Sequence, residues 1–262
     1  MSSLYRLVII SDCTDVAINE IRGAIDSNIG SERHGFVIEP AVTVVPWSVL
    51  NGAFLLRLLA DAYPPRTVFY VVLNPLEIPT QRVVGVCEKK EIAFIGRNTG
   101  VFGWLAKDYG VRKLIEISKG PYVAFGGKNI YPKAVASALR GDLLDRLGDE
   151  IDPARINDVD RSFGKILHID NFGISKISGE PSYFKRIGTK PDQLFSVVVK
   201  GVPMVTARFV NQLTAGQDGE WVIYDGSSLG GIPELAQVRM HGAYLLRLAV
   251  GDLVEFQPIL NP

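Results

Sequence analysis

Residues 5–25 read YRLVIISDCTDVAINEIRGAI, and the apolar pattern of this stretch changes once along its length. Residues 7–10 form an unbroken apolar run, which is typical of a strand that is buried on both faces of a sheet. A polar turn with Asp12 and Asp15 follows, and apolar residues then recur at helical spacing from Val16. The stretch therefore predicts a strand, a turn and a helix, the repeating unit of parallel α/β sheets.

The same alternation continues to about residue 150. Because strands alternate with helices, we expect a mostly parallel sheet joined by right-handed crossovers. A charged turn inside it, at 88–90, predicts a hairpin between its flanking apolar runs. The expected strands are 36–45, 67–73, 82–87 and 91–96, and the expected helices are 48–63, 101–110 and 131–148.

The residue pattern of the chain changes after residue 150. Residues 151–158 are polar, contain a proline and are interpreted as a linker between an α/β domain at 1–150 and a second domain at 159–262. Short strand-like runs separated by Gly, Pro and Asp then predict a smaller antiparallel β-barrel. These runs are 164–177, 194–201, 202–210, 220–226, 242–250 and 252–259.

Composition excludes several classes of function. The chain has 28 basic and 28 acidic residues without a long run of either sign, so we expect neither nucleic acid nor a membrane as a partner. Cys13 and Cys87 are too few for a disulfide framework. His34, His168 and His241 lack metal-ligand spacing, so no metal is expected. The short N-terminal apolar run, without a cleavage signal, predicts a cytoplasmic protein.

Residues 71–82, VVLNPLEIPTQR, begin as a buried strand and become polar at Asn74. Ligands of open α/β sheets bind at the carboxyl ends of the strands, so this polar cluster is a candidate site. A surface turn is the alternative and accounts for the same residues.

Five motifs in order extend over nearly the whole chain. They are IISDCTD at 9–15, the Pro–Trp–helix–double-Pro–strand segment at 44–75, FIGRNTGVF at 94–102, FGGKNIYPKAVA at 125–136 and LHIDNFGIS at 167–175. Together they resemble the S-adenosylmethionine hydroxide adenosyltransferases, the family that includes the fluorinase and the chlorinase. The resemblance implies an α/β domain followed by a β-barrel, homotrimers with ligands held between subunits, and attack on the 5′ carbon of the adenosyl group with release of methionine.

The resemblance also implies a catalytic set of Asp, Arg and His that activates water. In this chain Asn74 stands at the Asp position, Arg82 matches the Arg, and Gly126 replaces the His. Neither an amide nor a glycine can accept a proton from water, so hydrolysis should lose about 10² to 10⁴ in rate. The halogenating relatives also lack this Asp and His, but their long insertion is absent here, which disfavours halide as the nucleophile.

Several residues of the first domain match ligand-binding positions of the family. Asp12 matches an acid that binds the ribose hydroxyls, although a helix N-cap explains it equally well. Trp47 matches an aromatic residue that can pack on a sulfonium, or it is simply core. Pro75 and Phe125 match residues next to the catalytic positions.

The second domain supplies the remaining candidates. Asp170 matches an acid facing the ammonium of the ligand and Phe172 a ring near the adenine, whereas a β-turn accounts for the same motif. Ile174 replaces an Asn and cannot hydrogen-bond the adenine edge. Ser227 and Ser228 resemble carboxylate binders in a turn that a plain glycine loop also explains.

Two functions therefore stay open. The chain binds S-adenosylmethionine or a related adenosine compound and cleaves it slowly to adenosine and methionine, with no further cofactor. Alternatively, it is a non-catalytic adenosyl-binding or assembly protein.

Overall fold

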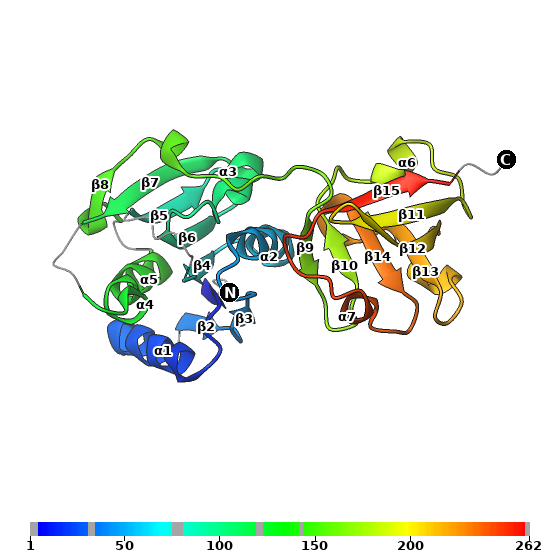
Figure 1. The fold of residues 1–262 in the computed structure, drawn as a ribbon. Coiled ribbons are helices and arrows are strands. Elements are labelled where there is room, and N and C mark those ends of the chain that lie inside the picture. The colour runs from blue at the N-terminus through cyan, green and yellow to red at the C-terminus, as the bar shows by residue number, and fades with distance from the viewer. Residues whose placement is uncertain (1–4, 31–34, 75–80, 119–122, 142–143, 260–262) are drawn as a thin grey trace. The chain divides into compact units, whose positions relative to one another are not determined.

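The computed structural model describes residues 5–30, 35–74, 81–118, 123–141 and 144–259. The chain divides into two compact units, Met1–Val159 and Asp160–Pro262, coloured blue to green and green to red in Figure 1. Each unit has its own sheet and its own core.

The first unit contains a sheet of eight described strands in the order β2-β1-β4-β6-β5-β7-β8, with β3 also paired to β1. Strand β1 pairs in parallel with β2, β3 and β4, and β4 pairs in parallel with β6. The other pairs are antiparallel. The strands are β1 (Tyr5–Ser11), β2 (Phe36–Ile38), β3 (Val42–Thr43), β4 (Thr67–Val72), β5 (Arg82–Cys87), β6 (Ile92–Arg97), β7 (Val111–Ile117) and β8 (Gly148–Glu150).

Helices cover both faces of this sheet. Helices α1 (Val16–Ile29) and α5 (Tyr131–Arg140) share a core with alternate residues of β1, β4, β5 and β6. On the other face, α2 (Val49–Ala62) packs against α3 (Gly103–Tyr109), and rings of β4 and β6 meet aromatic residues next to these helices. Alternation of the strand side chains thus fills both layers, as the continuous apolar runs predict.

The β5–β6 hairpin that the sequence predicts is confirmed. Gly85 lies in β5 opposite Phe94, and a Cβ atom added there would lie 1.9 Å from the Phe94 ring. The absence of a side chain at Gly85 therefore lets the Phe94 ring cross this strand.

The expected linker packs on the first unit. The Asn98 side chain donates to the carbonyl of Arg155 at 2.8 Å and accepts from the Asn157 amide at 2.8 Å. The indole of Trp104 donates to the carbonyl of Val159 at 2.8 Å. Residues 155–159 are therefore part of the first unit's hydrogen-bond network, and the division between units falls at Val159–Asp160.

The second unit is a β-barrel. Its sheet has seven described strands in the order β15-β11-β12-β13-β14-β10-β9, and all pairs except β12–β13 are antiparallel. A bridge between Lys165 and Leu253 joins the two edges. The strands are β9 (Ile166–Ile169), β10 (Ser175–Ile177), β11 (Leu194–Val199), β12 (Val202–Phe209), β13 (Trp221–Asp225), β14 (Pro233–Gln237) and β15 (Val254–Pro258), with the short helices α6 (Tyr183–Arg186) and α7 (Gly242–Leu245). The predicted fold class is confirmed.

Three local predictions were wrong. Segment 242–250 forms α7 and no strand, because the His241 imidazole accepts a hydrogen bond from the Tyr244 amide and starts a helical turn. The helix expected at 131–148 ends at Gly141, which adopts φ +70° and caps it. The strand expected at 36–45 is interrupted at Pro40, which has no amide hydrogen to donate to a ladder. Strands β7, β8 and β14 were not predicted at all.

Candidate functional site

The site begins at the carboxyl end of β1, where Asp12 connects three segments. One carboxylate oxygen, Oδ2, accepts hydrogen bonds from the amide of Asn74 at 3.0 Å and from the amide of Trp47 at 3.2 Å. These partners lie 62 and 35 residues away along the chain. Three of the predicted site residues are therefore brought together by a single carboxylate.

The alternative role of Asp12, as a helix cap, belongs to its neighbour. Helix α1 is capped by Asp15, whose Oδ1 accepts from the Ala17 amide at 2.9 Å. Ser11 fixes the start of the turn, because its hydroxyl donates to the carbonyl of Val72 at 2.9 Å. Asp12 is consequently held at the strand end without being needed for the helix.

The two aromatic candidates of this unit both have unusual backbones. Trp47 has φ +62° and Phe125 has φ +51°, in the left-handed region that residues with a β-carbon rarely adopt. Their side chains are 58% and 37% exposed, so neither is simply core. Conformations of this kind cost about 1–3 kcal/mol and tend to occur at functional sites.

A cavity of about 430 Å³ lies at the carboxyl ends of β1, β4 and β6. Its size falls in the usual range for small-molecule sites. One of its lining residues, Gly127, accepts a hydrogen bond at its carbonyl from the Tyr70 hydroxyl at 2.5 Å. The described lining residues are Cys13, Val71, Val72, Leu73, Asn74, Arg97, Val123, Phe125, Gly126, Gly127 and Tyr131.

Gly126 starts the short helix α4 (Gly126–Asn129) and opens space in this cavity. It is not among the glycines with positive φ. A Cβ added there would meet only the flexible end of Ile130, at 3.3 Å, and Tyr131 at 3.9 Å. The backbone therefore accepts a larger side chain at this position.

Two arginines stand at the ends of β5 and β6. Arg82, predicted to be catalytic, is the first residue of β5 and pairs across the hairpin with Arg97. Of the two, Arg97 is the one that lines the cavity. Arg97 was not selected from the sequence; it is the one charged residue of the motif FIGRNTGVF at 94–102, and this was the available signal. Pro75, the remaining candidate of this unit, lies outside the described residues.

In the second unit Asp170 makes a local turn. Its Oδ1 accepts from the amides of Phe172 at 2.9 Å and Ile174 at 3.0 Å. Phe172 is 69% exposed, whereas Ile174 packs on the core of Val210, Val222 and Tyr224. The turn thus presents the Phe172 ring to its surroundings and leaves Ile174 half-buried against this core.

Ser227 and Ser228 lie at the start of a 3₁₀ turn, η5 (Ser228–Gly230). Ser228 is buried and Ser227 is exposed. The turn approaches Glu234 closely, because a Cβ at Gly226 would lie 2.2 Å from its carboxyl carbon. Glu234 is itself buried and pairs with Lys176 at 2.7 Å, so it has a structural partner.

The histidines take structural positions where the structure describes them. Burial lowers the pKa of His168, with Lys176 acting in the same direction. His241 caps α7. His34 lies outside the described residues.

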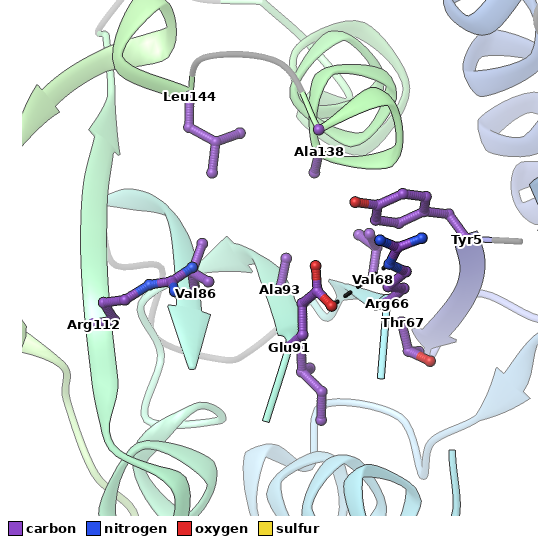
Figure 2. Close-up of a pocket in the computed structure, with 12 residues that line it drawn as sticks. Tyr5, Arg66, Thr67, Val68, Val86, Glu91, Ala93, Arg112, Ala138 and Leu144 are labelled. Atoms are coloured by element: carbon purple, nitrogen blue, oxygen red, sulfur yellow. Dashed lines mark ion pairs between the residues drawn. The ribbon is translucent and has the colours of Figure 1, made fainter. Parts of the chain in front are cut away.

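A second hollow, of about 240 Å³, lies at the opposite ends of the strands of the first unit (Figure 2). Arg66 stacks its guanidinium over the Tyr5 ring at 5.3 Å and pairs with Glu91 at 3.5 Å. Because the hollow lies at the amino ends of β4 and β6, it is a weaker candidate than the cavity beside α4.

Within the described parts of the chain, no group of three His, Cys, Asp or Glu side chains could hold a metal ion. No helix among the described residues is both long and apolar enough to cross a membrane.

Comparisons with known proteins agree with this architecture. A crystal structure of an uncharacterized conserved protein from Thermotoga maritima superimposes with a TM-score of 0.79 at 21% identity, covering 95% of this chain and 99% of the other. A conserved hypothetical protein from Thermus thermophilus gives a TM-score of 0.74 at 19% identity, covering 97% and 100%. These likenesses show the fold.

The sequence relatives are more specific. An (R)-S-adenosyl-L-methionine hydrolase of Methanocaldococcus jannaschii is 26% identical over 158 residues, which cover 58% of this chain and 58% of that protein. The model of the SAM hydroxide adenosyltransferase N-terminal domain matches residues 7–148, more than half of the chain. The chain therefore belongs to the SAM hydroxide adenosyltransferase family.

Proposed function

We propose that the chain binds S-adenosylmethionine, or a closely related adenosyl compound, in the cavity beside α4 and cleaves it with water to adenosine and methionine. The observation that carries this proposal is the Asp12 carboxylate, which holds Asn74 and Trp47 together at the carboxyl end of β1. This is the edge of an α/β sheet where ligands bind.

The chemistry needs little from the protein. Water attacks the 5′ carbon, the new C–O bond forms as the C–S bond breaks, and the sulfur leaves with the electron pair as a neutral thioether. The water proton passes to solvent, since neither Asn74 nor Gly126 can take it. Positioning and exclusion of bulk water therefore supply the acceleration, and slow turnover follows.

Each candidate residue has a role in this reaction. The remaining lone pairs of Asp12 accept the ribose hydroxyls, and the exposed ring of Trp47 packs on the sulfonium. Phe125 borders the adenosyl group, and Arg82 orients the water. Pro75 follows Asn74 directly in the sequence and is assigned to binding of the same ligand.

The second unit completes the site in a homotrimer, in which a neighbouring subunit provides the barrel residues. There Asp170 faces the ammonium of the ligand, Phe172 contacts the adenine, and Ser227 and Ser228 bind the carboxylate. The large exposure of Phe172 supports this assignment, because an exposed ring is free to be covered by a ligand or a partner.

The test is incubation of the purified protein with the (R) and (S) sulfonium epimers of S-adenosylmethionine, with adenosine followed by chromatography and binding by thermal shift. The expected result is slow release of adenosine, with the (R) epimer preferred in line with the relative from Methanocaldococcus jannaschii. A matched pair of variants reports on the site: Asp12→Asn should weaken binding, whereas Asp15→Asn keeps a good helix cap and should leave it unchanged. Absence of both product and thermal shift with either epimer would remove the proposal.

A second function is favoured by Asn74 and Gly126, which leave the described cavity without a general base. In this alternative the protein binds the adenosyl ligand without cleaving it, and a thermal shift without adenosine would select it. Halide as the nucleophile is the third and least supported possibility; formation of 5′-chloro-5′-deoxyadenosine in chloride buffer would reveal it.

A further inference from the structure

The cavity beside α4 contains a polar group that the proposed reaction leaves unused. Tyr131, the first residue of α5, lines the cavity and is 4% exposed. Its hydroxyl is buried and has no hydrogen-bond partner among the described residues. A buried hydroxyl without a partner destabilises a fold, so its presence calls for a ligand group that it meets.

A neighbouring tyrosine shows the contrast. The rings of Tyr70 and Tyr131 lie 5.7 Å apart, and both are buried. The Tyr70 hydroxyl donates to the carbonyl of Gly127 at 2.5 Å, whereas the Tyr131 hydroxyl is unsatisfied within the described parts of the chain. Burial raises the pKa of Tyr131 to about 12, against the opposing effect of Arg97 and Arg82, so the hydroxyl keeps its proton and acts as a donor at neutral pH.

The charge around this hydroxyl is positive. Arg97 lines the cavity, and Arg82 is its direct partner across the β5–β6 hairpin, which places both side chains on one face of the sheet. No Asp or Glu is among the described residues that line the cavity. An anion bound here would therefore meet the Arg97 guanidinium and satisfy the hydroxyl.

We propose that the Tyr131 end of the cavity is a carboxylate-binding subsite, in which the Tyr131 hydroxyl and the Arg97 guanidinium donate to the two carboxylate oxygens. A planar guanidinium matches the geometry of a carboxylate. The subsite rests on the proposed function in that the same cavity receives the adenosyl ligand. The carboxylate is either that of the methionyl part of this ligand, which Tyr131 and Arg97 would then hold in place of Ser227 and Ser228, or that of a separate small acid.

The first experiment uses a free carboxylate. Sodium acetate is titrated against the protein, with sodium chloride at equal ionic strength as reference, and binding is followed by thermal shift and by line broadening of ¹³C-acetate. Tyr131→Phe and Arg97→Gln should each weaken acetate binding at least tenfold, because each removes a hydrogen bond to a charged group.

Tyr109→Phe is the control, since it removes a satisfied tyrosine hydroxyl, which donates to Asp61 Oδ1 at 2.5 Å, from a residue that does not line the cavity. It should keep acetate binding and lower the melting temperature. Tyr131→Phe should keep or raise the melting temperature without acetate, because it removes an unsatisfied buried group.

The second experiment separates the two sources of the carboxylate. Affinities of S-adenosylmethionine and of its decarboxylated analogue are compared in the parent and in Tyr131→Phe. If the subsite takes the ligand's own carboxylate, only the affinity of S-adenosylmethionine falls, by at least tenfold, and acetate competes with it. If a separate acid binds there, Tyr131→Phe weakens acetate binding and leaves the affinity of S-adenosylmethionine unchanged.

A folded Tyr131→Phe protein that binds acetate and S-adenosylmethionine as tightly as the parent would overturn the subsite. Adenosine release is measured separately, so that a protein without hydrolase activity that still binds acetate through Tyr131 would remove the proposed reaction and keep the subsite.

Discussion

Asp12 and Asp170 both follow a strand, both belong to segments that resemble motifs of the family, and both accept two backbone amides, yet they do different things. Asp170 accepts from residues two and four positions ahead and closes its own turn. Asp12 accepts from residues 35 and 62 positions ahead and joins three segments of the first unit. The same residue type therefore makes a turn in the barrel and organises a candidate site in the α/β unit.

The largest expected effect comes from rebuilding the catalytic set on the Asp12 side. Asn74→Asp with Gly126→His should restore an Asp, Arg and His set and raise hydrolysis by about 10² or more, because general-base help contributes about 10² to 10⁴. The backbone admits a β-carbon at this position, since Gly126 does not use positive φ and a Cβ there meets only Ile130 and Tyr131. Single-turnover release of adenosine measures the gain.

The two single variants are the controls for this rescue. Groups that act as one catalytic unit are strongly non-additive, so each alone should do little. A folded double variant that binds as tightly as the parent and releases adenosine no faster would show that the cavity does not align water with the 5′ carbon, and the binding function would replace the hydrolase.

The next prediction tests how far along the chain the Asp12 and Asp170 carboxylates each stabilise backbone amides. Asp12→Ala should lower hydrogen-exchange protection of the distant Trp47 and Asn74 amides about tenfold or more, because each loses a charged acceptor. Asp170→Ala should affect only the amides of its own turn. Unchanged exchange at Trp47 and Asn74 would mean that Asp12 does not organise the site.

Cys13 offers a chemical probe of the same region. It lines the cavity, and burial raises its pKa above that of a free thiol, with Asp12 and Asp15 acting in the same direction and the hydrogen bond with Ser11 opposing them. Only the thiolate reacts, so alkylation should accelerate about tenfold per pH unit up to the raised pKa and slow when S-adenosylmethionine is bound. Cys87, buried with a pKa of about 12, is the internal control and should stay unlabelled in the folded protein.

Peptide mass spectrometry separates the two thiols. Labelling of Cys13 that does not respond to saturating ligand would place the ligand elsewhere.

The smallest expected effect comes from removing the negative charge of Asp170 in the barrel. Asp170→Asn keeps an oxygen that accepts both turn amides, so stability should change by less than about 0.5 kcal/mol. If Asp170 faces the ammonium of the ligand, affinity for S-adenosylmethionine should fall about two- to fivefold, the usual worth of an exposed ion pair. Calorimetric titration of the two proteins measures the difference, and equal affinities would leave Asp170 a turn residue only.

Much of the fold could be predicted because its signals are local. The apolar run of β1 and the hairpin of β5 and β6 each follow from a few neighbouring residues. Strand β14 was missed because its Pro and Glu give no β signal, and it forms where β13 and β10 offer ladder partners. Segment 242–250 was mistaken for a strand because a short apolar run has the same appearance in either structure.

The sequence by itself determined that this chain is an α/β unit followed by a barrel and that it resembles the adenosyltransferases, and it predicts that Asn74 and Gly126 stand in place of two catalytic groups. These properties depend on residue identity and order along the chain. Only the tertiary structure decided that Asp15 and not Asp12 caps α1, that Arg97 and Tyr131 enter the cavity, and that Asp12 joins Trp47 to Asn74. The reason is physical: a hydrogen bond across 62 residues depends on which strand ends meet at the edge of the sheet, and pairing of β1 with β4 sets that meeting.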